Sequence, residues 1–263
     1  MIYNVVVRYK STEQLHCFLG GKKMKKQNEK YGIMDRGIPT PEHKPKNNIT
    51  EVVFILDRSG SMAGMEEDTI GGFNTMIKNQ KAKDGKVYVS TVLFDNECEV
   101  LHDRVEIQNV KPMTRENYEV GGYTALFDAI GDAIHHIGNI HKYARSEDVP
   151  QNTIFIITTD GMENASRRYS SSEIKHIIKR QTEKFGWEFL FLAANIDAVE
   201  TAEHIGIRHD RAANYKQSSE GTQHLYETVG GVVDNLIKHP DRMNEYDEGV
   251  SFFLRKLDKE AKE

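Results

Sequence analysis

The chain has 263 residues, of which 38% are hydrophobic and 29% charged, and its formal net charge is −5. This length fits one domain of about 200 residues with appendages. No apolar run approaches the roughly 20 residues that a membrane-spanning helix needs, so we expect a soluble protein. The two cysteines, Cys17 and Cys98, form no C-x-x-C pair. Since no secretory signal pattern is present either, we expect a cytoplasmic protein without a disulfide framework.

The first 49 residues differ from the rest in charge. They hold ten basic and four acidic residues, a net of +6, so the remainder carries −11. We interpret residues 1–49 as an N-terminal arm, with an expected strand at 3–9, followed by a basic linker that contains three prolines. The basic stretch from Lys22 to Lys46 is interpreted as a solvated tail. An acidic main body predicts no nucleic-acid partner, because phosphates require clustered Lys and Arg.

From Thr50 onward, apolar runs typical of buried strands alternate with helical spacing. The expected elements are a strand at 52–56, a helix at 65–81, a strand at 87–94 turning into a hairpin strand at 98–101, a helix after 124, a strand at 153–158, a capped helix after 170, a strand at 187–194, a short helix at 199–205, a short strand at 212–215 and a helix at 221–237. This order predicts an α/β fold with a doubly wound, mostly parallel sheet and one antiparallel edge strand. We expect the domain to span 50–238 and residues 239–263 to form a tail or a docking helix.

Polar side chains gather in three loops at the expected ends of the sheet, where open α/β sheets bind ligands. The carboxylates are Asp57 and Asp160, and the hydroxyls are Ser59, Ser61 and Thr124. All five are hard oxygen donors, which suit Mg²⁺, Mn²⁺ or Ca²⁺ rather than zinc or copper. Two carboxylates only match the charge of a divalent cation, so we expect the cation to keep an exchangeable position for a carboxylate of another molecule.

These residues resemble the metal-ion-dependent adhesion site, or MIDAS, of von Willebrand factor A (vWA) domains. The resemblance spans residues 50–237 and implies a Rossmann-like vWA fold and a protein-interaction function. It implies direct metal contacts from Ser59, Ser61 and Thr124, and contacts often made through water from Asp57 and Asp160. Arg58 and Met62 resemble bacterial intracellular members, some of which accompany tellurium-resistance or stress-response systems.

The preferred hypothesis is a metal-dependent binding module without catalysis, whose protein partner supplies a carboxylate. One alternative is a metal-dependent phosphohydrolase that uses Asp57 as its nucleophile, although Ser59 stands where such enzymes place a second Asp. The other alternative is a scaffold in which the metal only joins loops. Glu163 and Asn164 are interpreted as a solvated turn. The sequence leaves the ion, the partner and the oligomeric state open.

Overall fold

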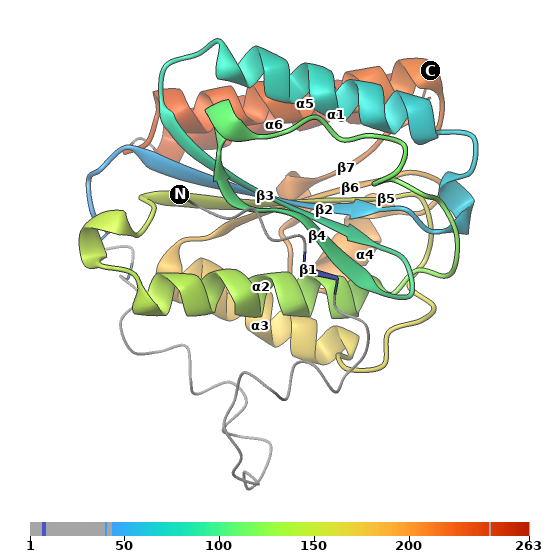
Figure 1. The fold of residues 1–263 in the computed structure, drawn as a ribbon, viewed down its shortest axis with the longest axis horizontal. Coiled ribbons are helices and arrows are strands. Elements are labelled where there is room, and N and C mark those ends of the chain that lie inside the picture. The colour runs from blue at the N-terminus through green and yellow to red at the C-terminus, as the bar shows by residue number, and fades with distance from the viewer. Residues whose placement is uncertain (1–6, 9–39, 41–43, 242, 263) are drawn as a thin grey trace, which may run out of the picture.

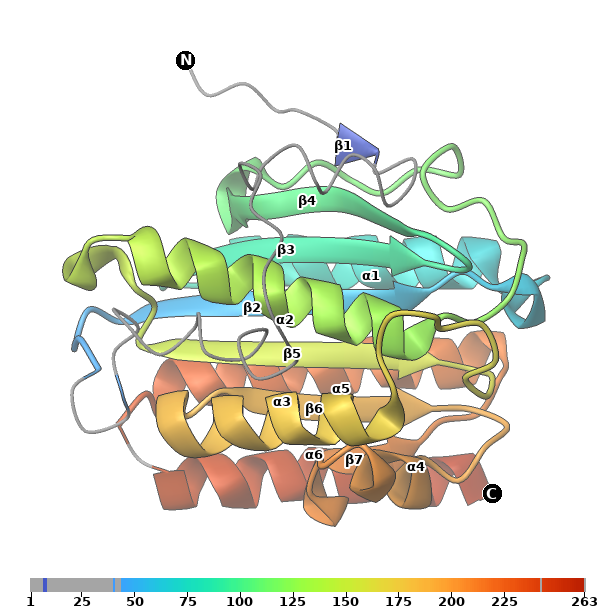
Figure 2. The same cartoon turned by 90° about the horizontal axis from the view of Figure 1, so that it is seen from below.

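The computed structural model describes residues 7–8, 40, 44–241 and 243–262. These residues form a seven-stranded sheet in the order β1-β4-β3-β2-β5-β6-β7, covered by helices on both faces (Figures 1 and 2). The strands are β1 (Val7–Arg8), β2 (Ile49–Asp57), β3 (Lys86–Phe94), β4 (Cys98–Glu106), β5 (Asn152–Thr159), β6 (Glu188–Ala193) and β7 (Ala212–Asn214). The helices are α1 (Glu66–Lys81), α2 (Leu126–Tyr143), α3 (Ser171–Phe185), α4 (Ala198–His204), α5 (Ser219–Lys238) and α6 (Met243–Lys262).

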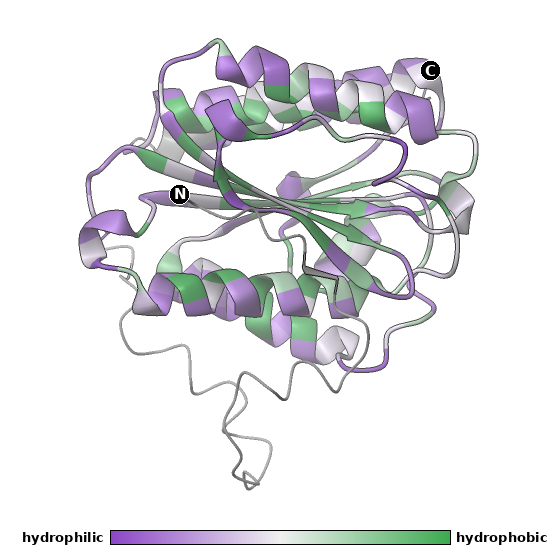
Figure 3. Cartoon of the chain, viewed as in Figure 1, coloured by the Kyte–Doolittle hydropathy of each residue, from purple (hydrophilic) through white to green (hydrophobic). Residues whose placement is uncertain are grey.

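The sheet separates two apolar layers. Helices α1, α5 and α6 cover one face, and α2, α3 and α4 cover the other (Figure 1). Successive residues of a strand point to opposite faces, so in β2 the side chains of Phe54 and Leu56 enter the first layer while Val53 and Ile55 enter the second. Burial on both faces explains why the central strands are continuous apolar runs, as Figure 3 shows.

The doubly wound, mostly parallel fold predicted from the sequence is confirmed. Strands β3, β2, β5, β6 and β7 pair in parallel, and β4 alone runs against them. Strand β4 reaches Glu106, five residues beyond the expected hairpin strand, and its register with β3 shifts near Thr91. Outside β4, Val7 and Arg8 pair antiparallel with Val100 and Glu99, so β4 is not the last strand of the sheet. The rest of the expected strand at 3–9 lies outside the described residues.

The helix boundaries follow local capping signals. The cap expected after residue 170 is a capping box of Ser170 and Glu173, with both reciprocal hydrogen bonds formed at the start of α3. Helix α5 begins after Ser218, whose side chain accepts a hydrogen bond from the backbone N–H of Gly221. Since each cap satisfies a backbone N–H group that has no partner inside the helix, these residues fix where the loops at the carboxyl end of the sheet stop.

The segments at the two ends of the expected domain pack on it. Before β2, Asn47 donates hydrogen bonds to the backbone oxygens of Glu147 and Val149 at 2.9 and 2.8 Å. After α5, helix α6 buries Val250, Leu254 and Leu257 in the layer that it shares with α1 and α5. Helix α6 is thus packed against the domain. No helix among the described residues is long and apolar enough to cross a membrane.

Candidate metal site

The three loops singled out in the sequence meet at the carboxyl ends of β2 and β5. Asp57 is the last residue of β2, and Asp160 directly follows β5. These two strands are parallel neighbours, with Leu56 opposite Thr158, so their ends reach the same edge of the sheet. Thr124 stands two residues before α2, and the hydrogen bond from Gly60 N to Gly122 O holds its loop against the loop after β2.

Four of the five predicted side chains form one hydrogen-bonded chain. The hydroxyl of Ser59 lies 3.1 Å from that of Ser61 and accepts a hydrogen bond from the hydroxyl of Thr124, also at 3.1 Å. The hydroxyl of Ser61 donates to Oδ1 of Asp160 at 2.5 Å. Oxygens from loops as distant in sequence as 61 and 160 therefore converge on one point.

Asp57 joins this cluster through the backbone. Its Oδ1 accepts a hydrogen bond from the backbone N–H of Ser59 at 2.7 Å, and its Oδ2 accepts one from the hydroxyl of Thr159 at 2.6 Å. The hydroxyl of Tyr118 donates to the backbone oxygen of Asp57. Both carboxylate oxygens and the carbonyl are thus held in place, which orients Asp57 towards the loop that carries Ser59.

The site is buried except at Ser61. Asp57, Ser59, Thr124 and Asp160 expose 1–3% of their surface, whereas Ser61 is exposed. Burial raises the pKa of Asp57 above its usual value, and the nearby charge of Asp160 raises it further. Burial also raises the pKa of Asp160. A cation between the two carboxylates would compensate the charge that burial disfavours.

The donor set fits a hard divalent cation. It offers two carboxylates and three hydroxyls, and oxygen ligands of this kind suit Mg²⁺, Mn²⁺ or Ca²⁺. Among the described residues, no group of three or more His, Cys, Asp and Glu side chains could hold a metal ion, so hydroxyls are needed to complete a site here. Gly161 keeps the cluster open, because a Cβ there would lie 3.2 Å from the hydroxyl of Ser61 and 3.5 Å from that of Thr124.

Arg58 places its positive charge away from this cluster. Its guanidinium forms ion pairs at 2.9 Å with Asp95 and with Glu99, and these pairs raise its pKa although burial opposes them. Its backbone N–H also donates to the carbonyl of Phe94. Arg58 therefore holds the β3–β4 hairpin beside the site, and its charge is compensated by two carboxylates.

Two neighbouring residues interpreted as a solvated turn have structural roles instead. Asn164 accepts a hydrogen bond from the backbone N–H of Thr124 at 2.9 Å, and its own N–H donates to the carbonyl of Thr124. The carboxylate of Glu163 accepts from the backbone N–H of Phe127, in the first turn of α2, and from that of Ser166. Both residues fix the Thr124 loop, and only their positions after an expected strand hinted at this role.

Gln217 is a contact that sequence reasoning missed. It lies in the loop between β7 and α5, and its amide donates to Oδ2 of Asp160 at 2.7 Å and to the backbone oxygen of Ser61 at 3.0 Å. Its carbonyl accepts a hydrogen bond from Asn195 at 2.6 Å. A glutamine more than 50 residues from Asp160 carries no local signal, so only the fold brings it to the site.

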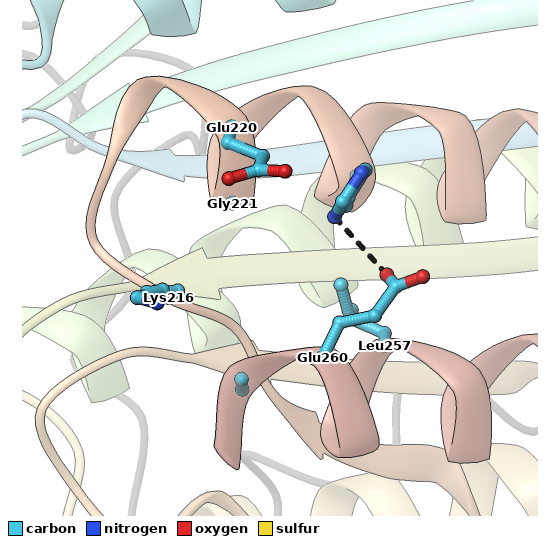
Figure 4. Close-up of a pocket in the computed structure, with 7 residues that line it drawn as sticks. Lys216, Glu220, Gly221, Leu257 and Glu260 are labelled. Atoms are coloured by element: carbon cyan, nitrogen blue, oxygen red, sulfur yellow. Dashed lines mark ion pairs between the residues drawn. The ribbon is translucent and has the colours of Figure 1, made fainter. Parts of the chain in front are cut away.

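The residue before Gln217 borders a separate hollow between α5 and α6. This hollow measures about 400 Å³ and is crossed by an ion pair between Nδ1 of His224 and Oε2 of Glu260, 3.1 Å apart (Figure 4). Its lining also includes Lys216, Glu220 and Leu257. None of the five predicted metal-site residues lines it, so we assign it no part in the site.

Comparison with known proteins supports the fold. No family model and no curated protein matches the sequence. A mutant of the PilB minor pilin from Streptococcus sanguinis is similar over 74% of this chain and 63% of its own, with 14% identity and a TM-score of 0.51. The ArnB paralog VWA2 from Sulfolobus acidocaldarius is similar over 70% of this chain and 45% of its own, with 17% identity and a TM-score of 0.47. Manganese-loaded TRAP protein from Plasmodium vivax is similar over 62% of this chain and 64% of its own, with 16% identity and a TM-score of 0.45.

The present chain spans less than two thirds of the length of each of these structures. At 14% identity, the likeness to the pilin structure is one of fold alone. The chain has a Rossmann-like α/β fold, with helices on both faces of a mostly parallel sheet that contains one antiparallel strand.

Proposed function

We propose that this protein is a divalent-cation-dependent protein-binding module. The cation would be held by Asp57, Ser59, Ser61, Thr124 and Asp160, and the partner would contribute an acidic side chain. When bound, Mg²⁺ or a similar ion supplies positive charge and an exchangeable coordination position. The observation that carries the proposal is the hydrogen-bonded convergence of four of these side chains, at 2.5–3.1 Å, from three separate loops.

The chain's own residues prepare the site before any partner arrives. The hydroxyl of Thr159 and the backbone N–H of Ser59 hold the two oxygens of Asp57, and Asn164 holds the backbone of Thr124. Ligands fixed in this way lose little conformational freedom on binding, which favours affinity. Ser61 is the exposed member of the set, so a partner would approach from its side.

A nucleophilic role for Asp57 fits this arrangement less well. Its side chain is 1% exposed, and each carboxylate oxygen already accepts a hydrogen bond from within the protein. A phosphoryl acceptor would need one of these oxygens free and in line with the phosphorus. We therefore propose binding rather than phosphohydrolase chemistry. The resemblance of Arg58 and Met62 to bacterial intracellular members, some associated with tellurium resistance, suggests the setting in which to seek a partner.

A peptide-display selection tests the function and can be run with no partner protein in hand. Two libraries of seven-residue peptides are compared, one with a fixed central Asp and one with a fixed central Asn, selected on the protein in Mg²⁺ and eluted with EDTA. We expect EDTA to release peptides only from the Asp library, and only when Thr124 is intact. Equal recovery from both libraries, or from a Thr124→Ala variant shown to be folded, would refute a carboxylate–metal contact.

A further inference from the structure

Two of the most exposed large apolar side chains flank the candidate metal site. Tyr123 exposes 66% of its surface and Met162 exposes 72%. Tyr123 precedes Thr124 in the chain, and Met162 is two residues beyond Asp160. Because the Cα atoms of adjacent residues are only about 3.8 Å apart, the backbones of Tyr123 and Met162 lie close to those of Thr124 and Asp160.

The loops that carry these side chains are fixed next to each other. The backbone N–H of Tyr123 donates to the side chain of Asn96. Gly161, which precedes Met162, approaches the hydroxyls of Ser61 and Thr124 closely enough that a Cβ there would contact both. Tyr123 and Met162 are therefore exposed apolar side chains on the two loops that carry Thr124 and Asp160, and we call this pair the rim.

The charge around this rim restricts the ligand further. Arg58, the cationic residue between two proposed ligands, is committed to Asp95 and Glu99 and offers no charge to a partner. Glu97 and Glu119, on the loops beside Tyr123, are exposed. A partner segment with several acidic residues would meet these carboxylates, whereas a single acidic residue would reach the cation without them.

We propose that the partner surface is a segment with one Asp or Glu flanked by apolar side chains, which pack on Tyr123 and Met162. This rests on the proposed function and names the class of partner for the same site. An anionic group at the cation sets the position of the segment, and the apolar neighbours supply affinity by removing the rim from water. An uninterrupted acidic run would meet the like charges of Glu97 and Glu119, so its additional carboxylates should add no affinity.

Defined peptides test this inference. Three seven-residue peptides carry a central Asp, and its neighbours are Leu and Phe in the first, Ser in the second and further Asp in the third. Each has a counterpart with a central Asn, and all affinities are measured in Mg²⁺ and in EDTA. We expect the apolar-flanked Asp peptide to bind at least about tenfold more tightly than the Ser-flanked one, and the acidic run to bind no better than the latter.

Protein variants assign the preference to the rim. The double variant Tyr123→Ser/Met162→Ser should lose the tenfold advantage while its Mg²⁺ affinity, measured by calorimetry, stays the same. The matched control is Tyr143→Ser/Phe252→Ser, which removes two side chains that are 78% and 60% exposed on α2 and α6. This control should keep the advantage.

The outcomes separate this inference from the function on which it rests. If peptides require both Asp and Mg²⁺ but flanking residues make no difference, or if the rim variant keeps the preference, the rim proposal is wrong and the proposed function stands. If no peptide requires both Asp and Mg²⁺, both proposals fail. Apolar-flanked peptides that bind equally with Asp, with Asn and in EDTA would also overturn the inference.

Discussion

Replacing Asp57 by Asn should stabilise the metal-free protein and remove its response to metal. Asp57 is 1% exposed, and burial is the main cause of its raised pKa. The hydrogen bonds that Asp57 accepts are compatible with the side-chain amide of an asparagine at this position. Its oxygen can keep the N–H of Ser59, and its NH₂ can donate to the hydroxyl of Thr159, whose proton can turn to the carbonyl of Gly161 at 3.1 Å. The substitution thus removes a buried charge while keeping the local geometry.

The two effects have opposite signs. Without metal, loss of the buried charge should raise the free energy of unfolding at neutral pH, because burial disfavours the ionised carboxylate of Asp57. With Mg²⁺ at 100 times the dissociation constant, wild-type protein should gain about 2.7 kcal/mol and the variant nothing. For a protein of this size, 1 kcal/mol shifts the melting temperature by about 2–4 °C. The order of stability should therefore reverse when metal is added.

The pH dependence follows from the same raised pKa. The folded-state pKa of Asp57 lies above that of the unfolded chain, so the ionised form weighs against folding at pH values above the ordinary aspartate pKa of about 3.9. The metal-free wild-type protein should therefore lose stability progressively as the pH rises from there through the raised pKa. The advantage of the Asn variant should accordingly grow with pH over that window and then level off.

Thermal unfolding of both proteins in EDTA and in Mg²⁺, from pH 4 to pH 8, measures these effects. The matched control is Glu106→Gln, which removes an exposed carboxylate at the end of β4 that pairs with the start of β3, away from the site, and should change neither the metal response nor its pH profile. An Asp57→Asn protein that is less stable than wild type in EDTA, or one that gains the same stability from Mg²⁺, would refute the reasoning.

Three further predictions concern the surroundings of the site. Asn164→Ala should lower the free energy of unfolding, measured by chemical denaturation, by about 1–2 kcal/mol, because it leaves the backbone N–H of Thr124 without its acceptor. Asn96→Ala should lower it less, because the N–H of Tyr123 that it leaves is exposed to water, and equal losses would contradict this. Gln217→Ala should tighten Mg²⁺ binding by up to about tenfold in calorimetric titration, because it removes an N–H donor that competes for Asp160, and weaker binding would contradict it. Burial raises the pKa of Cys98 to about 12, so in a Cys17→Ser background its thiol should react with a disulfide reagent at pH 8 at least about a hundredfold more slowly in folded protein than in urea, and similar rates would contradict it.

Sequence patterns predicted the central fold well because burial on both faces leaves a strong signal. Continuous apolar runs identified β2, β5 and β6. Strand β4 was predicted too short, since Asp103 and Arg104 interrupt its pattern and Arg104 adopts a positive φ of 49° at the register shift with β3. A half-exposed strand with such a shift has no regular period to read.

Some residues of the candidate site could likewise be predicted from the sequence, and others could not. Its five proposed ligands stand at strand ends or just before a helix, so their order and chemistry were visible in the sequence, and the structure brings them together. Gln217 and Asn164 were missed because they act through contacts that depend on the whole fold. Neither residue type is distinctive, and the hydrogen bonds join them to residues 57 and 40 positions away.

Thermal unfolding after removal of metal by EDTA, with Mg²⁺, Mn²⁺ or Ca²⁺ then added back, tests the metal site most directly. The comparison is the double variant Ser59→Ala/Ser61→Ala, which removes two of the three hydroxyls while keeping both carboxylates. We predict a metal-dependent rise in the melting temperature of wild-type protein, equivalent to about 2.7 kcal/mol at 100 times the dissociation constant, and none in the variant. Equal rises in both proteins, or no rise with any ion and no heat in direct titration of folded wild-type protein, would contradict the account.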